Sequence, residues 1–111
     1  MKLRVALLGA GNVTRAFLDY WRQRDFGIDL RVVSVLRKRS AWHGDESAAI
    51  DPDGLPYSPG LDPFNGAKLV IEALPSVYPH GEPATSLLIA ALERGIDILT
   101  VDMAVWKWTP R

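Results

Sequence analysis

The sequence predicts an α/β fold built on a parallel sheet, because short apolar runs of strand length alternate with segments of helical periodicity. Four runs suit buried strands: residues 3–8 (LRVALL), 30–36 (LRVVSVL), 67–74 with its centre at 69–71, and 96–101 (IDILTV). Alternation of strand and helix implies right-handed crossovers. We therefore expect a Rossmann-like, doubly wound parallel sheet of about four strands in the order 3-2-1-4.

Two segments between these runs have the apolar spacing of helices. The first begins at Asn12 and stops before Gly27, and the second has Pro83 in its first turn and stops at Gly95. The apolar stripe of the first helix consists of Val13, Ala16, Phe17, Tyr20 and Trp21. Residues 40–66 show no clear period, and the four prolines and three glycines within residues 51–66 predict a loop.

The composition is that of one soluble globular domain, residues 1–111. The 13 basic and 13 acidic side chains cancel, which argues against a protein that binds nucleic acid by neutralising phosphates. Because cysteine is absent, disulfides and thiol nucleophiles are excluded, and the two separate histidines, His43 and His80, do not predict a metal site. No apolar run is long enough to cross a membrane, so the expected location is cytoplasmic.

A glycine-rich turn joins the first predicted strand to the first predicted helix. Gly9 allows the tight turn, Gly11 leaves room for a phosphate beside the backbone, and the helix start offers free N–H groups. The dinucleotide fingerprint has glycine or alanine where this sequence has Thr14. We expect a nucleotide here, with a turn that holds no ligand as the alternative. The expected phosphate-binding residues are Gly9, Ala10, Gly11, Asn12, Val13 and Thr14.

Three consecutive basic residues, Arg37, Lys38 and Arg39, follow the second predicted strand. An NAD site usually has a carboxylate there, which binds the ribose hydroxyls. Arginine instead offers a planar fork of donors that suits a phosphate. The sequence therefore predicts NADP as the cofactor, with NAD as the second choice and a solvated basic loop as the alternative.

Three segments resemble the homoserine dehydrogenase family. GAGNVTRAFLDYW (residues 9–21) is similar to the family's GxGxVG turn and first helix, and DPDGLP (residues 51–56) to its DPDGLD-like loop. VIEALPSVYPHGEPATSLLIAALERGIDILT (residues 70–100) resembles a family stretch that contains GEPA and an AALERG run. The resemblance implies an NAD(P)-dependent oxidoreductase that interconverts homoserine and aspartate semialdehyde in amino-acid biosynthesis. It also implies that Leu74, Pro75 and Ser76 lie where the nicotinamide ribose passes.

Two features depart from that family. The family usually continues with a TANK motif whose lysine faces the substrate, and Met103 stands at that position; the family's substrate domain also has no counterpart in these 111 residues. We therefore expect the nucleotide-binding domain of a homoserine dehydrogenase-like enzyme that is not catalytic by itself, and we assign no catalytic residue. The alternative is a non-catalytic NADP-binding module that senses redox state or regulates a partner.

The fourth predicted strand lies at an edge of the expected sheet. We expect its backbone groups to lack a partner there, and we expect the aromatic residues that follow it, Trp106 and Trp108, to be exposed. We expect two copies of the chain to form a homodimer through this edge.

Overall fold

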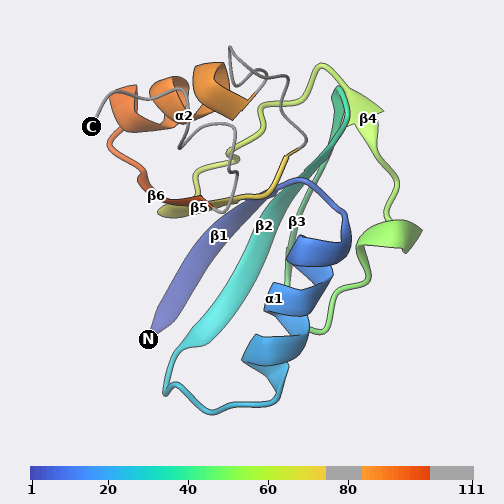
Figure 1. Ribbon diagram of the computed structural model, residues 1–111, viewed down its shortest axis with the longest axis vertical. Coiled ribbons are helices and arrows are strands. Elements are labelled where there is room, and N and C mark those ends of the chain that lie inside the picture. Colours follow the sequence, from blue (N-terminus) through green and yellow to red (C-terminus); the bar gives the residue numbers. More distant parts are fainter. Residues whose placement is uncertain (75–83, 101–111) are drawn as a thin grey trace.

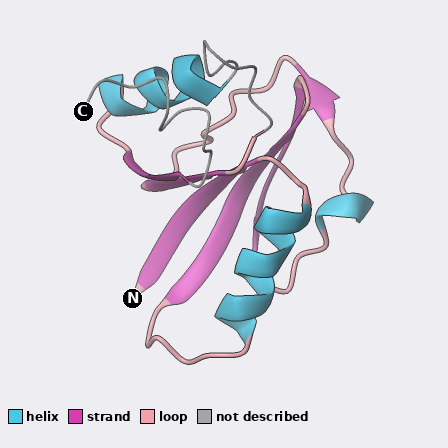
Figure 2. Cartoon of the chain, in the orientation of Figure 1, coloured by secondary structure: helices cyan, strands magenta, loops and turns pink. Residues whose placement is uncertain are grey.

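The computed structural model describes residues 1–74 and 84–100, which form a six-stranded sheet with a helix packed on either side (Figure 1, Figure 2). The predicted α/β class and both predicted helices are confirmed. Within the described residues, no helix is long and apolar enough to cross a membrane. In chain order the elements are β1 (Lys2–Leu8), α1 (Asn12–Arg22), β2 (Asp29–Arg37), β3 (Ser40–Glu46), the short 3-10 helix η1 (Pro52–Gly54), β4 (Ser58–Pro59), β5 (Leu69–Glu72), α2 (Ala84–Glu93) and β6 (Asp97–Thr100).

The sheet is mostly parallel, with the strand order β4-β3-β2-β1-β5-β6. β1 pairs in parallel with β2 on one side and with β5 on the other, and β5 pairs in parallel with β6. β3 and β4 add antiparallel pairs beside β2. The four strands that the sequence predicts thus lie in the order 2-1-3-4, so the predicted order 3-2-1-4 is wrong.

A tight hairpin after β2 causes this difference. Arg37 pairs with Ser40 across a two-residue turn, and β3 then runs back along β2. Because β3 and β4 occupy the outer edge of β2, the next parallel strand pairs with the free edge of β1 instead. The sequence pattern missed this hairpin because its turn has no glycine or asparagine, the usual residues at left-handed turn positions. Lys38 itself adopts the left-handed conformation, with a φ of 57°.

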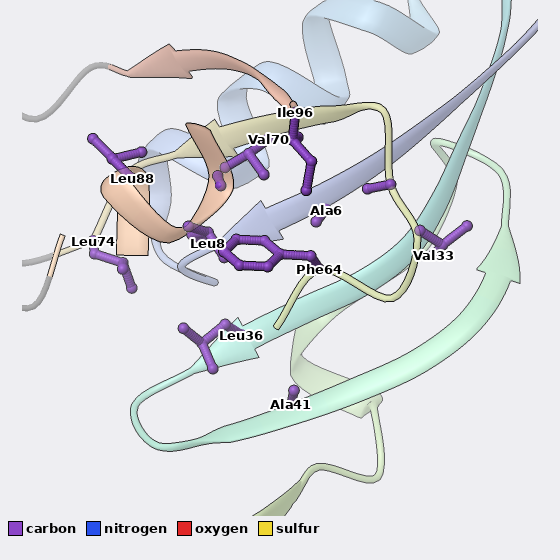
Figure 3. Packing of buried hydrophobic residues seen from close by; sticks show 12 residues of the cluster. Ala6, Leu8, Val33, Leu36, Ala41, Phe64, Val70, Leu74, Leu88 and Ile96 are labelled. Atoms are coloured by element: carbon purple, nitrogen blue, oxygen red, sulfur yellow. The ribbon is translucent and has the colours of Figure 1, made fainter. Parts of the chain in front are cut away.

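The core lies on both faces of the sheet, because alternate side chains of β1 point to opposite sides. Ala6 and Leu8 belong to the cluster under α2, and Val5 and Leu7 belong to the cluster under α1. Figure 3 shows the first of these clusters around Phe64. These four residues at the end of β1 are 0% exposed, as expected of a strand that has neighbours on both edges and both faces.

The crossover that leads into β5 uses an irregular segment where many α/β proteins use a helix. Phe64, only 1% exposed, fills the core under α2 (Figure 3). The Asn65 side chain donates to the carbonyl of Val33 at 2.7 Å. Asp62 accepts from the Arg94 guanidinium at 2.9 and 3.0 Å. Side chains of this loop thus fix it to the sheet and to the end of α2.

α1 turns a different face toward the sheet from the one its apolar spacing predicts. Thr14 and Leu18 are buried, whereas Val13 and Tyr20 are about half exposed. Trp21 is half-buried and packs against the α1-side cluster, so its predicted core position is confirmed in part. The first turn of the helix decides this rotation, because it places the Thr14 hydroxyl beneath the helix against the carbonyl of Gly9.

Trp42 lies in β3, half-buried against the α1-side cluster, with its indole ring over Gly44. A Cβ on Gly44 would lie 2.1 Å from the nearest ring carbon. The two residues are on the same face of the strand because they are two positions apart. The Trp42 ring thus occupies the space that a side chain at position 44 would need.

Gly44→Ala is expected to lower the free energy of unfolding by about 1–3 kcal/mol, because the ring must move out of its packed position. Gly54→Ala is the matched control, since in the described part of the chain nothing but its sequence neighbours lies within 4 Å of the Cβ that it adds. Chemical denaturation of both variants and the unchanged chain measures the difference. Equal stability of the two variants would contradict the packing described.

Candidate functional site

Gly9 directly follows β1 and lies against the ends of the two neighbouring strands, β2 and β5. Its φ is +111°, and an added Cβ would lie 2.8 Å from the carbonyl oxygen of Ala73, just after β5. Its N–H donates to the carbonyl of Leu36 in β2 at 2.9 Å. Glycine is therefore required for two reasons, the left-handed backbone and the lack of space.

Gly11 differs from Gly9 in both respects. Its φ of −89° is open to other residues, and apart from its own chain neighbours no atom of the described residues lies within 4 Å of the Cβ position. No side chain caps the start of α1, where Gly11 is the residue before the first turn. The first N–H groups of a helix have no partner within the helix. The structure thus leaves open space beside a helix start, which is what a phosphate group needs.

Thr14 replaces the small third residue of the dinucleotide fingerprint without separating the helix from the sheet. Its hydroxyl donates to the carbonyl of Gly9 at 2.8 Å, and the side chain is 2% exposed. The hydroxyl thus binds a backbone carbonyl of the turn, and the methyl group is buried with it. This side chain tightens the turn and is not available to a ligand.

The three basic residues Arg37, Lys38 and Arg39 lie at the end of β2 and in the hairpin turn that follows, and all three are exposed. Arg37 and Lys38 reach the same cleft as the glycine turn, but Arg39 is not among the residues that line it. The Arg37 guanidinium also lies 5.9 Å from the centre of the Tyr57 ring. A lysine with positive φ is uncommon, and such backbone outliers concentrate at ligand-binding sites.

The cleft has a volume of about 490 Å³, within the range of small-molecule sites, and it opens at the carboxyl end of the parallel strands. It brings together six of the residues that the sequence predicts, whereas Asn12 and Val13 lie on α1 outside it. Pro75 and Ser76 lie outside the described residues. The lining residues are Gly9, Ala10, Gly11, Arg15, Arg37, Lys38, Asp53, Ala73 and Leu74.

Arg15, Asp53 and Ala73 are the lining residues that the sequence pattern missed. The Arg15 guanidinium, on the first turn of α1, forms an ion pair with the Asp53 carboxylate of η1. Asp53 belongs to the DPDGLP segment, so the family resemblance of that segment was the sequence feature that could have placed it in the cleft. The sequence did not predict a role for Arg15, because its partner Asp53 is 38 residues away along the chain.

The loop around η1 is stabilised within itself. Asp51 accepts from the N–H of Asp53 at 3.0 Å, and the Tyr57 hydroxyl donates to the carbonyl of Pro52 at 2.6 Å. Burial raises the pKa of the Tyr57 phenol, and the negative charges of Asp53 and Asp51 raise it further, while Arg37 and Arg15 act in the opposite direction. Charged residues from the basic turn, the first helix and the loop thus all act on the Tyr57 phenol.

Two polar side chains outside the cleft, Glu72 in β5 and His43 in β3, have structural partners. Glu72, fully buried at the end of β5, accepts from the N–H of Leu74 at 2.9 Å and from the Thr100 hydroxyl of β6. His43 is in β3, and its Nε2 is 2.5 Å from the carbonyl oxygen of Asp62. The residues with described positions include no cluster of side chains that could hold a metal ion.

Two solved structures share the fold of this chain. One is a hyperthermophilic archaeal homoserine dehydrogenase in complex with NADPH, with a TM-score of 0.72, and the other is a hyperthermophilic archaeal homoserine dehydrogenase mutant in complex with NADPH, with a TM-score of 0.69. Each is 19% identical to this chain, and each match covers 94% of this chain but 37% of the other. The chain thus spans well under half the length of these enzymes. No family model and no curated protein sequence matches it.

Gly9→Ala and Gly11→Ala are expected to differ sharply in stability. Gly9→Ala should lower the free energy of unfolding by roughly 2 kcal/mol or more, because it adds backbone strain and a clash with Ala73. Gly11→Ala should change it by less than about 1 kcal/mol, since the position is open and only the helix cap is altered. Thermal unfolding followed by circular dichroism checks both, and a large loss in Gly11→Ala would show that this glycine serves the fold.

Proposed function

We propose that this chain is the NADP-binding domain of a homoserine dehydrogenase-like oxidoreductase. The observation that carries the proposal is that one cleft joins the glycine turn and helix start to Arg37 and Lys38. Two anion-binding features in one cleft fit a dinucleotide with a pyrophosphate and a further phosphate. Two of the solved structures that share the fold, both in complex with NADPH, support the same cofactor.

The residues around the cleft fit the separate parts of NADP. Gly11 and the open start of α1 would take the pyrophosphate, because a side chain at position 11 would fill the space that it needs. Arg37 and Lys38 would take the 2′-phosphate. Leu74 lies at the end of β5, where the nicotinamide ribose would pass with Pro75 and Ser76 nearby in the sequence. Bound NADP would supply the hydride acceptor, and these residues would bind and orient it.

We propose the interconversion of homoserine and aspartate semialdehyde as the reaction of the whole enzyme, with these 111 residues as its nucleotide-binding part. The resemblance of the three sequence segments and the fold support this reaction. The chain matches 37% of the length of the enzymes that share its fold. The cleft offers cations and open backbone for a cofactor, so these residues are proposed to bind the nucleotide and not to complete the catalysis.

Association of two copies through the last strand is also part of the proposal. β6 is the edge strand of the described sheet, and its Leu99 side chain is about half exposed. Ile89 and Leu92 of the adjacent helix α2 are also exposed. These three apolar side chains support a contact at this edge, while Trp106 and Trp108 lie outside the described residues.

Titration of the purified chain with NADP and with NAD, measured by calorimetry, tests the cofactor directly. The unchanged chain is expected to bind NADP more tightly than NAD. Gly11→Val should abolish binding of both while the protein stays folded, because the valine side chain occupies the space of the pyrophosphate. Normal NADP binding by a folded Gly11→Val variant would contradict the proposed pose.

Arg37→Asp should turn the preference from NADP toward NAD. One lost charge-assisted hydrogen bond is worth roughly 1.5–3 kcal/mol, which corresponds to about a tenfold to hundredfold loss in NADP affinity. The new carboxylate repels the 2′-phosphate and accepts hydrogen bonds from the free ribose hydroxyls of NAD. Arg39→Asp is the control, since Arg39 does not line the cleft. If both variants bind both nucleotides as the unchanged chain does, the basic turn has no part in cofactor choice.

A further inference from the structure

Asp53 places a negative charge in a cleft that is otherwise positive. Among the described residues that line the cleft it is the only acid, and Arg15, Arg37 and Lys38 are the cations. A carboxylate here opposes a bound phosphate, whose charge is about −1.5 to −2 near neutral pH. Asp53 is therefore unexpected in a site that selects a 2′-phosphate.

The stability that the ion pair with Arg15 contributes does not explain why an acid stands at position 53. The side chains of Arg15 and Asp53 are 38% and 57% exposed. Ion pairs that are exposed to this extent contribute little, because water and salt screen them. The loop is held by other contacts, namely the Asp51 carboxylate on the N–H of Asp53 and the Tyr57 hydroxyl on the carbonyl of Pro52. The loop would thus present position 53 to the cleft without the ion pair.

Arg15 and Arg37 line the same cleft, and each contacts the loop around η1, Arg15 through Asp53 and Arg37 through the Tyr57 ring. The phenol of Tyr57 is within electrostatic reach of Arg15, Arg37 and Asp53, and the Arg37 guanidinium lies over its ring. An anion that Arg37 binds would therefore share the cleft with the Arg15 guanidinium, which is engaged with Asp53. A phosphate that binds Arg15 in this cleft has to compete with Asp53.

We propose that Arg15 is a third cation for the 2′-phosphate and that Asp53 is its resident counter-ion, which the phosphate displaces when NADP binds. This inference rests on the proposed NADP site and deepens it. The Arg15–Asp53 pair satisfies the guanidinium in the free protein and lowers the affinity for NADP. NAD has no phosphate at this position and leaves the pair intact. Asp53 thus sets how strongly the site prefers NADP over NAD.

Asp53→Asn is the direct test, because it removes the competing charge and keeps the shape of the side chain. NADP and adenosine 2′,5′-bisphosphate are expected to bind roughly threefold to tenfold more tightly at low salt, as for the loss of a partly screened charge pair. The gain should shrink as the salt concentration rises. NAD should bind as it does to the unchanged chain. Arg15→Gln should weaken NADP and leave NAD unchanged.

Asp19→Asn provides a matched control, because Asp19 belongs to a similar ion pair on α1, the helix that carries Arg15. Asp19 pairs with Arg22, and these side chains are 55% and 39% exposed, close to the values of Asp53 and Arg15. Asp19 does not line the cleft. Its substitution removes the same charge from the same kind of ion pair one helical turn from Arg15, so it should tighten NADP far less than Asp53→Asn does and leave NAD unchanged. Tightening in Asp19→Asn equal to that in Asp53→Asn would reduce the effect to net charge and overturn the inference.

The double variant Arg15→Gln/Asp53→Asn separates exchange of the counter-ion from simple repulsion. If Asp53 acts through Arg15, most of the gain from Asp53→Asn should be lost in the Arg15→Gln background. An equal gain in both backgrounds would overturn the exchange. Weaker NAD binding by Asp53→Asn would show instead that Asp53 holds the ribose hydroxyls, which also overturns it.

The same titrations distinguish this inference from the proposal beneath it. If the unchanged chain prefers NADP but Asp53→Asn has no effect, the NADP site stands and the role of Asp53 is overturned. If the unchanged, folded chain binds neither nucleotide, the proposed function fails and the inference fails with it.

Discussion

Gly9 is the point at which the central strand, its two neighbours and the first helix converge. Its N–H is bound to Leu36 of β2, its carbonyl accepts from Thr14 of α1, and Ala73 after β5 lies against the place of its missing side chain. The carboxyl ends of three parallel strands can approach this closely only where one of them has no Cβ. The cleft opens beside this junction, so its shape depends on the contacts that Gly9 permits.

Thr14 shows how the turn keeps its geometry with an unusual residue. A small side chain at this position normally lets a helix pack closely on the strand. Thr14 is larger, but its hydroxyl occupies a position where it satisfies a buried carbonyl of the turn. Such a hydrogen bond offsets the desolvation of both groups. Thr14 thus keeps the helix packed on the strand through a hydrogen bond to the turn.

The β2–β3 hairpin links the topology of the sheet to the chemistry of the cleft. By closing the outer edge of β2, it sends the chain back across to β1, where β5 completes the wall with Ala73 and Leu74. Its tip also carries the basic residues, with Lys38 in a left-handed conformation. A helix in place of the hairpin would leave β2 a different neighbour and would move these charges. The loop around η1 then brings Asp53 against Arg15, which gives the cleft both signs of charge.

The sequence by itself determined the features that depend on neighbouring residues. The strand cores, both helices, the glycine turn and the basic run after β2 follow from periodicity and from residue types such as Gly9, whose backbone conformation excludes other residues. It did not determine the order of the strands, because a strand pattern does not state which free edge it will pair with. A two-residue turn without glycine concealed the antiparallel β3, and that hidden strand decided the order.

Only the tertiary structure decided which charged residues share the cleft. Arg37 and Lys38 line it whereas Arg39, the next residue, does not, because a hairpin turn points successive side chains in different directions. Arg15 and Asp53 are 38 residues apart and meet only after the loop has folded back on α1. The inward position of Thr14, against the apolar spacing of the helix, has the same origin. A local pattern records which side chains are available, but contacts between distant segments select the ones that face the site.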